Sequence, residues 1–240
     1  MKAAGIKVES VAFTYATTSI TVQTSNTIIE RCKTYGISLE SGSYNTTIRQ
    51  CFIQGATVGG SSASQHTIEN CIIIDDGDFA LSALKRSTIR NNTFCTYYNN
   101  SSQKYAYVRS LSECVITNNI FLNTKNSEGV FYSCSNCTVK NNVLCCTGSS
   151  YETENITGVT TKAELFTLTG ENDRAFQLKD DSPAKGYATD GGDCGAYGGR
   201  YPYVPSGYPL GIPHFNSSVV GTRPQSGQVS VTQEVTIQKQ

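Results

Sequence analysis

The chain has little charge, no tryptophan, one methionine and two histidines among its 240 residues. Charged residues make up 16% of it and balance to a formal net charge of zero, without a block or stripe of Lys and Arg. Because neutralising phosphates needs clustered Lys and Arg, nucleic acid is excluded as a partner. No run of about 18 apolar residues occurs, so no segment is expected to span a membrane.

A short phrase recurs along the first 142 residues. It ends in cysteine in the copies at 28–32, 47–51 and 67–71, and in Asn-Asn in the later copies. The apolar residues at its centre are Ile29, Ile48, Ile68, Ile89, Ile116 and Val139, which gives steps of 19, 20, 21, 27 and 23 residues. A period near twenty that tolerates insertions indicates a solenoid, in which each coil buries its faces only by stacking on its neighbours.

Each coil is predicted to hold three short strands. The phrase forms the first, a run such as Ile72-Ile73-Ile74 forms the second, and a run such as Gly36–Leu39 forms the third. β-branched and aromatic residues alternate with Ser and Thr at a period of two, and no amphipathic helix longer than about ten residues appears. The sequence therefore predicts an all-β solenoid of about seven coils.

The last position of the phrase defines a file of side chains, occupied by Cys32, Cys51, Cys71, Asn92, Asn119 and Asn142. Stacked coils place equivalent residues about 4.8 Å apart with parallel side chains, whereas a disulfide needs facing Cβ atoms. We expect free thiols that point inward, with disulfides and a metal as the alternatives. For the asparagines we expect left-handed bends and amides that bond from coil to coil.

The repeated T-I-x-N-N/C phrase resembles the right-handed parallel β-helix of the pectin lyase-like superfamily. The segment from Phe176 to Gly186, followed by Asp193 to Gly199, is similar to the closing segment of many secreted bacterial members. The resemblance covers roughly residues 8–200. It is specific for fold and not for reaction, because the superfamily includes lyases, hydrolases, epimerases, tailspikes and non-catalytic modules.

The resemblance implies that the third strands and the loops before them line a polysaccharide groove. Alternation from inward Leu39, Val58, Leu81, Val108 and Phe131 predicts that the outward residues of these strands are Glu40, Gly59, Ser82, Arg109 and Tyr132. Ser38, Thr57, Ala80, Tyr107 and Val130 are expected alongside them.

Two loops carry the candidate chemistry. If the coils stack in register, Asp76, Asp78, Tyr97, Tyr98, Tyr107 and Arg109 gather at one edge. Tyr97, Tyr98, Tyr107 and Tyr132 would stack on sugars, and Arg109 would hold a carboxylate. Asp76 and Asp78, with Arg109, are the candidate catalytic residues, since the Asp-Asp pair resembles the motif of polygalacturonase-like glycosidases.

Simpler interpretations of the same residues stay open. Asp75–Asp78 is rich in turn-forming residues, the tyrosines fit an ordinary loop, and Arg109 fits a surface charge. The segment from Asp190 to Asp193 could hold calcium, although a structural turn is preferred. The lone Cys134-x-x-Cys137 and the two histidines, His66 and His214, give little support for a metal or a nucleophilic triad, so no cofactor or metal is expected.

The sequence favours three domains and one function. Residues 1–150 form the coils, residues 151–200 close the solenoid, and residues 201–240 form a Pro-rich strap with terminal strands. We expect an exported protein that recognises polysaccharide, with a lyase or glycosidase and a structural or adhesive solenoid as the alternatives. No signal peptide is present at Met1–Gly5, so the export signal is expected in a missing N-terminal part.

Overall fold

The computed structural model describes most of the chain, and it divides into two compact units, Met1–Tyr203 and Val204–Gln240. The described residues are 5–13, 18–55, 58–75, 80–96, 108–122, 130–145, 151, 153–159, 161–170, 172–205, 214–220 and 231–236.

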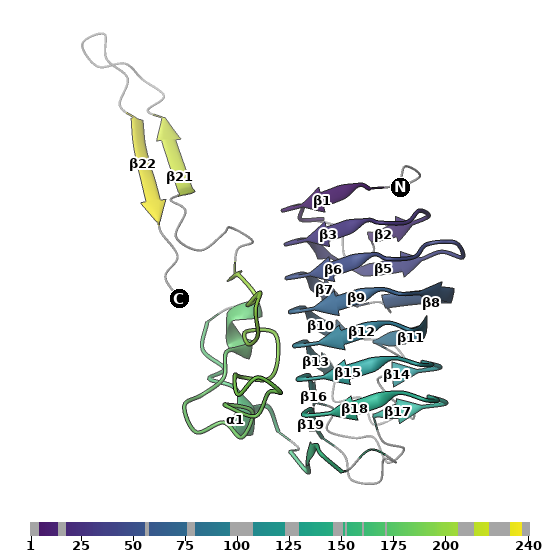
Figure 1. Ribbon diagram of the computed structural model, residues 1–240. Helices are drawn as coiled ribbons and strands as arrows, with labels where there is room; N and C mark the ends of the chain where they lie inside the picture. The colour runs from purple at the N-terminus through teal and green to yellow at the C-terminus, as the bar shows by residue number, and fades with distance from the viewer. Residues whose placement is uncertain are drawn as a thin grey trace, which may run out of the picture. The chain divides into compact units, whose positions relative to one another are not determined.

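The first unit is a solenoid whose stacked coils form three parallel β-sheets (Figure 1). Sheet A contains β1 (Lys7–Glu9), β3 (Ile28–Glu30), β6 (Thr47–Arg49), β9 (Thr67–Glu69), β12 (Thr88–Arg90), β15 (Val115–Thr117) and β18 (Thr138–Lys140). Sheet B contains β4 (Lys33–Thr34), β7 (Phe52–Gln54), β10 (Ile72–Asp75), β13 (Thr93–Thr96), β16 (Ile120–Leu122), β19 (Val143–Leu144) and β20 (Ile156–Thr157). Sheet C contains β2 (Ser19–Val22), β5 (Gly36–Leu39), β8 (Val58–Ser64), β11 (Leu81–Lys85), β14 (Val108–Arg109) and β17 (Phe131–Tyr132).

The predicted all-β parallel solenoid is confirmed, but it makes about five turns instead of about seven. The complete turns run from β3 to β17, and each contributes one strand to every sheet. The turns at either end, which begin with β1 and with β18, each lack one of the three strands within the described residues. The repeat was therefore identified correctly, while its terminal copies were counted as whole coils.

The core lies between the three sheets. The central residue of the phrase points inward in every coil, and Ile29, Ile48, Ile68, Ile89 and Ile116 are fully buried. Phe94 and Phe121 on consecutive strands of sheet B stack with their ring centroids 4.5 Å apart. Each such side chain contributes about 1.5–3 kcal/mol when it leaves water, and only stacking of the coils provides that burial.

The bend between sheets A and B uses two adjacent residues with different tasks. The first of them, Arg31, Gln50, Asn70, Asn91, Asn118 or Asn141 in successive coils, has a left-handed backbone with φ between 52° and 60°. The second is the predicted file from Cys32 to Asn142, which is buried and in register. The prediction was therefore wrong in assigning the left-handed conformation to the file, because the preceding residue takes it.

Within the file, amides and thiols occupy equivalent places. Asn92 Nδ2 donates to the backbone oxygens of Ile68 and Arg90, at 2.8 and 3.0 Å. Cys71 takes the place of Asn92 in the coil before, and its Sγ lies 3.7 and 3.3 Å from the equivalent oxygens, those of Ile48 and Glu69. Cys32, Cys51 and Cys71 are buried free thiols, as expected. The thiols therefore donate to carbonyl oxygens equivalent to those that the amides reach, but more weakly.

Residues 187–202, which we call the clamp segment, run along the outside of this bend. The side-chain amides of the left-handed residues donate to it coil after coil: Asn141 to Tyr187 O, Asn118 to Thr189 Oγ1, Asn91 to Asp193 O, Asn70 to Ala196 O and Gly198 O, and Gln50 to Pro202 O. The approach is close, since a Cβ on Gly195 would lie 2.7 Å from Ile120 Cδ1. The clamp segment thus ties five coils together. It follows two short helical pieces, α1 (Lys162–Leu165) and η1 (Asn172–Phe176).

The second unit contains an antiparallel hairpin of β21 (His214–Val220) and β22 (Val231–Thr236). Terminal strands were expected within residues 201–240, and β21 and β22 both lie in that range.

Candidate functional site

The outer face of sheet C carries a row of residues in strict register. The row runs Thr21, Ser38, Gly59, Ser82, Arg109 and Tyr132 from the first strand to the last. Thr21, Arg109 and Tyr132 are exposed, and Ser38 and Ser82 are half-buried. At about 4.8 Å per strand, the row extends for about 24 Å. This outer row is the candidate functional site.

Several predicted positions on this face need correction. Ser38, not Glu40, pairs with Gly59, because Ile37 and not Leu39 faces Val58. Glu40 is still exposed at the end of β5, where its Oε1 accepts a hydrogen bond from Ser38 Oγ at 3.3 Å. Ala80 and Val130, expected alongside the outward residues, are 0% and 1% exposed and belong to the core.

Arg109 and Tyr132 form the most prominent part of the outer row. They are partners on the adjacent parallel strands β14 and β17, and Arg109 Cζ lies 6.0 Å from the centre of the Tyr132 ring. Tyr132 is 45% exposed. The pair presents a guanidinium fork, a flat aromatic face and a phenol hydroxyl on one surface.

The remaining predicted site residues, Asp76, Asp78, Tyr97, Tyr98 and Tyr107, lie outside the described residues. Thr57, expected beside Gly59, also lies outside them. Asp75 is the last residue of β10 and pairs with Thr96 of β13. The catalytic and sugar-stacking roles of these loops therefore stay predictions.

Sequence reasoning missed a column of charged residues on the outer face of sheet A. It runs Glu9, Glu30, Arg49, Glu69 and Arg90 on consecutive strands, and the sign alternates from Glu30 onward. The signal was present in the repeated phrase, whose third residue reads Glu, Arg, Glu, Arg in the copies from Glu30 to Arg90. A register prediction could have turned that alternation into ion pairs between coils.

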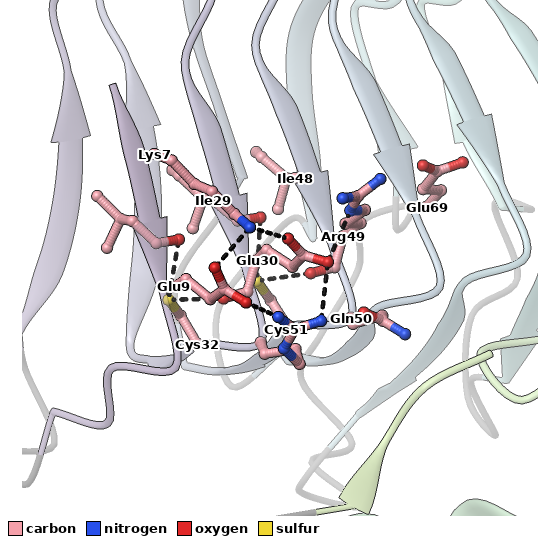
Figure 2. Close-up of polar contacts among 12 residues, drawn as sticks. Lys7, Glu9, Ile29, Glu30, Cys32, Ile48, Arg49, Gln50, Cys51 and Glu69 are labelled. Atoms are coloured by element: carbon pink, nitrogen blue, oxygen red, sulfur yellow. Dashed lines mark hydrogen bonds and ion pairs between the residues drawn. The ribbon is translucent and has the colours of Figure 1, made fainter. Parts of the chain in front are cut away.

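Glu30 is the centre of this column (Figure 2). Its buried carboxylate pairs with Lys7 Nζ, Arg31 Nη1 and Arg49 Nε, each at 3.0 Å. Burial opposes the charge of Glu30, but the contacts with Arg49 and Lys7 prevail and hold its pKa below the ordinary value. Arg90 grips Glu69 through Nε and Nη2, at 2.9 and 2.6 Å. The ion pairs form two groups, one that links β1, β3 and β6 and one that links β9 and β12, and each group helps to hold its strands in register.

Metal-ligating side chains are scattered over the described part of the chain. No cluster there brings together three or more His, Cys, Asp or Glu side chains suited to a metal. Asp190 Oδ1 accepts the Gly192 N–H and Asp193 Oδ1 accepts the Gly186 N–H, both at 3.0 Å. Both carboxylates thus stabilise turns of the closing segment.

Comparison with protein-family models, with curated proteins and with solved structures finds no match to this chain. Among the described residues, no helix is long and apolar enough to cross a membrane.

Proposed function

We propose that this protein binds a polysaccharide along the outer face of sheet C. The observation that carries the proposal is the exposed Arg109–Tyr132 pair in line with the polar residues Ser82, Ser38 and Thr21. The proposal includes export of the protein, since polysaccharides of this kind are met outside the cell.

The chemistry of the outer row suits a sugar polymer. A tyrosine ring offers a flat apolar surface to the C–H face of a pyranose, and its hydroxyl remains available at the edge. The serine and threonine hydroxyls can donate to and accept from sugar hydroxyls. The Arg109 guanidinium supplies several donors in a fixed plane, which suits a carboxylate or a pair of vicinal hydroxyls.

Two other polar surfaces in the described part of the solenoid make contacts within the chain. The bend between sheets A and B is covered by the clamp segment through its amide contacts. In the charged column of sheet A, Glu30 and Glu69 form ion pairs with Arg49 and Arg90. Those two surfaces serve to hold the coils together, whereas the outer row is proposed as the binding surface on the chemistry of its side chains.

The test is a comparison of three alanine variants over a panel of soluble neutral and acidic polysaccharides. Tyr132→Ala and Arg109→Ala are each expected to weaken binding about tenfold or more, because each removes a contact of about 1.4 kcal/mol. Tyr44→Ala is the matched control, since Tyr44 is 48% exposed and lies outside the outer row. Equal affinity of all three variants and the wild type, or no binding to any polysaccharide, would overturn the proposal.

A further inference from the structure

The bend between sheets C and A is built in the same way as the bend between sheets A and B. Its first residue has a left-handed backbone in successive coils, with φ between 48° and 60° at Asn26, Asn45, Gln65, Arg86, Glu113 and Asn136. The residue after it is buried from Thr27 to Cys114. His66 Nδ1 accepts the Thr46 N–H at 3.1 Å. Asn119 Oδ1 accepts the Asn92 N–H in the same way at the other bend, at 2.9 Å. Each bend therefore combines an inward residue, bonded to the coil before it, with a left-handed residue on the outside.

The two bends differ in what covers them. At the bend between sheets A and B, the clamp segment leaves only 2–5% of three amide side chains exposed, those of Asn70, Asn91 and Asn118. At the bend between sheets C and A, Asn26, Asn45 and Gln65 follow one another on three consecutive coils, and all three are exposed. Asn45 Nδ2 donates to Asn26 Oδ1 at 2.7 Å. Because a side-chain amide carries two N–H donors, this bond leaves both amides able to donate to a further acceptor.

The clamp segment shows what a row of amides in this conformation binds. Asn70 Nδ2 donates to Ala196 O and Gly198 O, at 2.9 and 2.6 Å. Asn91 Nδ2 donates to Asp193 O at 3.2 Å. The acceptors are backbone carbonyl oxygens, which every polypeptide segment offers whatever its side chains.

The backbone of such a segment must approach the amides closely. A Cβ on Gly199 would lie 2.8 Å from Asn91 Cγ, so glycine is needed where the clamp segment crosses this amide. Residues 187–202 advance four coils, about 19 Å at one strand spacing per coil, which is less than half the length of a fully extended chain. The segment that fits is therefore irregular and contains glycine.

We propose that Asn26, Asn45 and Gln65 bind a glycine-containing, irregular polypeptide segment of a partner protein, through its backbone carbonyl oxygens, as the other bend binds the clamp segment. The amide site ends at Gln65, because the next two left-handed residues are charged and Glu113 pairs with Lys85 at 3.2 Å. The site is separate from the outer row of sheet C and does not depend on the proposed function.

The first test measures the binding of a labelled synthetic peptide, with the sequence of residues 187–202, to the whole protein under reducing conditions. The triple variant Asn26→Gly, Asn45→Gly and Gln65→Gly keeps the left-handed backbone accessible and deletes only the amides. It should bind the peptide about tenfold more weakly or worse, because several hydrogen bonds are lost.

Asn136→Gly is the matched control for the triple variant. Asn136 has the same left-handed backbone, with φ of 53°, and is exposed in the same bend three coils beyond Gln65. The control should stay within about twofold of the wild type. No binding of the peptide, equal affinity of the triple variant and the wild type, or an equal loss in Asn136→Gly would overturn the proposal.

The second test uses the unaltered protein, so it does not depend on how the variants fold. In NMR spectra, the added peptide should shift the side-chain amide signals of Asn26, Asn45 and Gln65 and leave unchanged those of Asn70, Asn91 and Asn118, which the clamp segment covers. Shifts at the covered amides instead would mean that the peptide replaces the clamp segment, which would overturn the proposal. Shifts at the three exposed amides with polysaccharides but not with the peptide would assign the bend to a glycan and overturn it equally.

Discussion

Asn142 Oδ1 accepts two hydrogen bonds from Asn119 on the coil before it, one from the backbone N–H at 2.9 Å and one from the side-chain amide at 3.0 Å. Asn119 in turn accepts the same pair of bonds from Asn92. All three side chains are 0% exposed. A chain of buried amides therefore links consecutive coils in the half of the solenoid where the thiols give way to asparagine.

Asn119→Ala should be strongly destabilising. The substitution leaves Asn92 N–H, Ile89 O and part of Asn142 without their partners in a buried place. With about 1–3 kcal/mol for each buried group left unsatisfied, we expect the free energy of unfolding to fall by about 3 kcal/mol in urea denaturation. Asn119→Cys should lose less, because cysteine occupies the same place at Cys71. A loss below about 1 kcal/mol in Asn119→Ala would contradict the importance of the amide ladder.

The clamp segment should loosen when one of its amide anchors is removed. Asn118 donates to Thr189 Oγ1 at 3.1 Å and accepts the Thr189 N–H at 2.9 Å, with a left-handed φ of 60°. Asn118→Gly keeps that backbone accessible and deletes only the amide, so hydrogen exchange should accelerate at residues 187–202 and little elsewhere. Asn118→Ala should cost about 1 kcal/mol more, since alanine resists the left-handed region. Unchanged exchange at Thr189 in both variants would show that the anchor is dispensable.

The features that depend on the period of the repeat could be predicted from the sequence. The pairing of strands that are separated by loops of unequal length could not. The file from Cys32 to Asn142 follows from the spacing of the phrase alone, and the structure confirms it. Glu40 was aligned with Gly59 because alternation within a strand fixes the face but not the partner. The strands β5 and β8 are separated by a whole coil, and only their hydrogen bonds show that Ser38 is the partner.

Long-range contacts explain the other omissions. The clamp segment bonds to residues as far as 152 positions away, from Gln50 to Pro202, and no local pattern indicates such a contact. The outward placement of Arg109 and Tyr132 on sheet C could be predicted, because both follow inward residues in clear alternation.

Acid should weaken the fold in two ranges, the first of which belongs to His66. Its Nδ1 accepts the Thr46 N–H at 3.1 Å, and burial lowers its pKa from 6.5 to about 4. Between these two pH values the unfolded chain binds a proton at His66 and the folded chain does not. The free energy of unfolding therefore falls as the pH drops from 6.5 to about 4, by up to about 3 kcal/mol.

Urea midpoints measured across that range test the assignment. His66→Thr should flatten the dependence, and threonine fits the column because Thr27 and Thr46 occupy it in the preceding coils. An equal slope between pH 6.5 and 4 in the variant would exclude His66 as the cause.

Glu30 should account for the second range. Its pKa is held below the ordinary 4.5, so its contribution to stability is present above that value and is lost as the pH falls further. At pH 7, Glu30→Gln should lower the free energy of unfolding by about 3 kcal/mol, because Lys7, Arg31 and Arg49 lose a buried counter-charge. The difference in free energy of unfolding between Glu30→Gln and the wild type should be smaller at pH 3 than at pH 7.

Glu113→Gln is the control for Glu30, because the ion pair of Glu113 with Lys85 is about half exposed on both sides. It should change stability by less than about 0.5 kcal/mol at any pH. A similar effect of the two substitutions would mean that the burial of Glu30 is unimportant.

Mapping the bound glycan by NMR tests the account most directly. With the best ligand from the polysaccharide panel, amide shift changes are expected at Thr21, Ser38, Ser82, Arg109 and Tyr132 on the outer row of sheet C. Thr47, Thr67 and Thr88, aligned in the same way on the outer face of sheet A, should stay unchanged. Shift changes at Thr47, Thr67 and Thr88 instead, or a lack of shift changes at Arg109 and Tyr132, would contradict binding along the outer row.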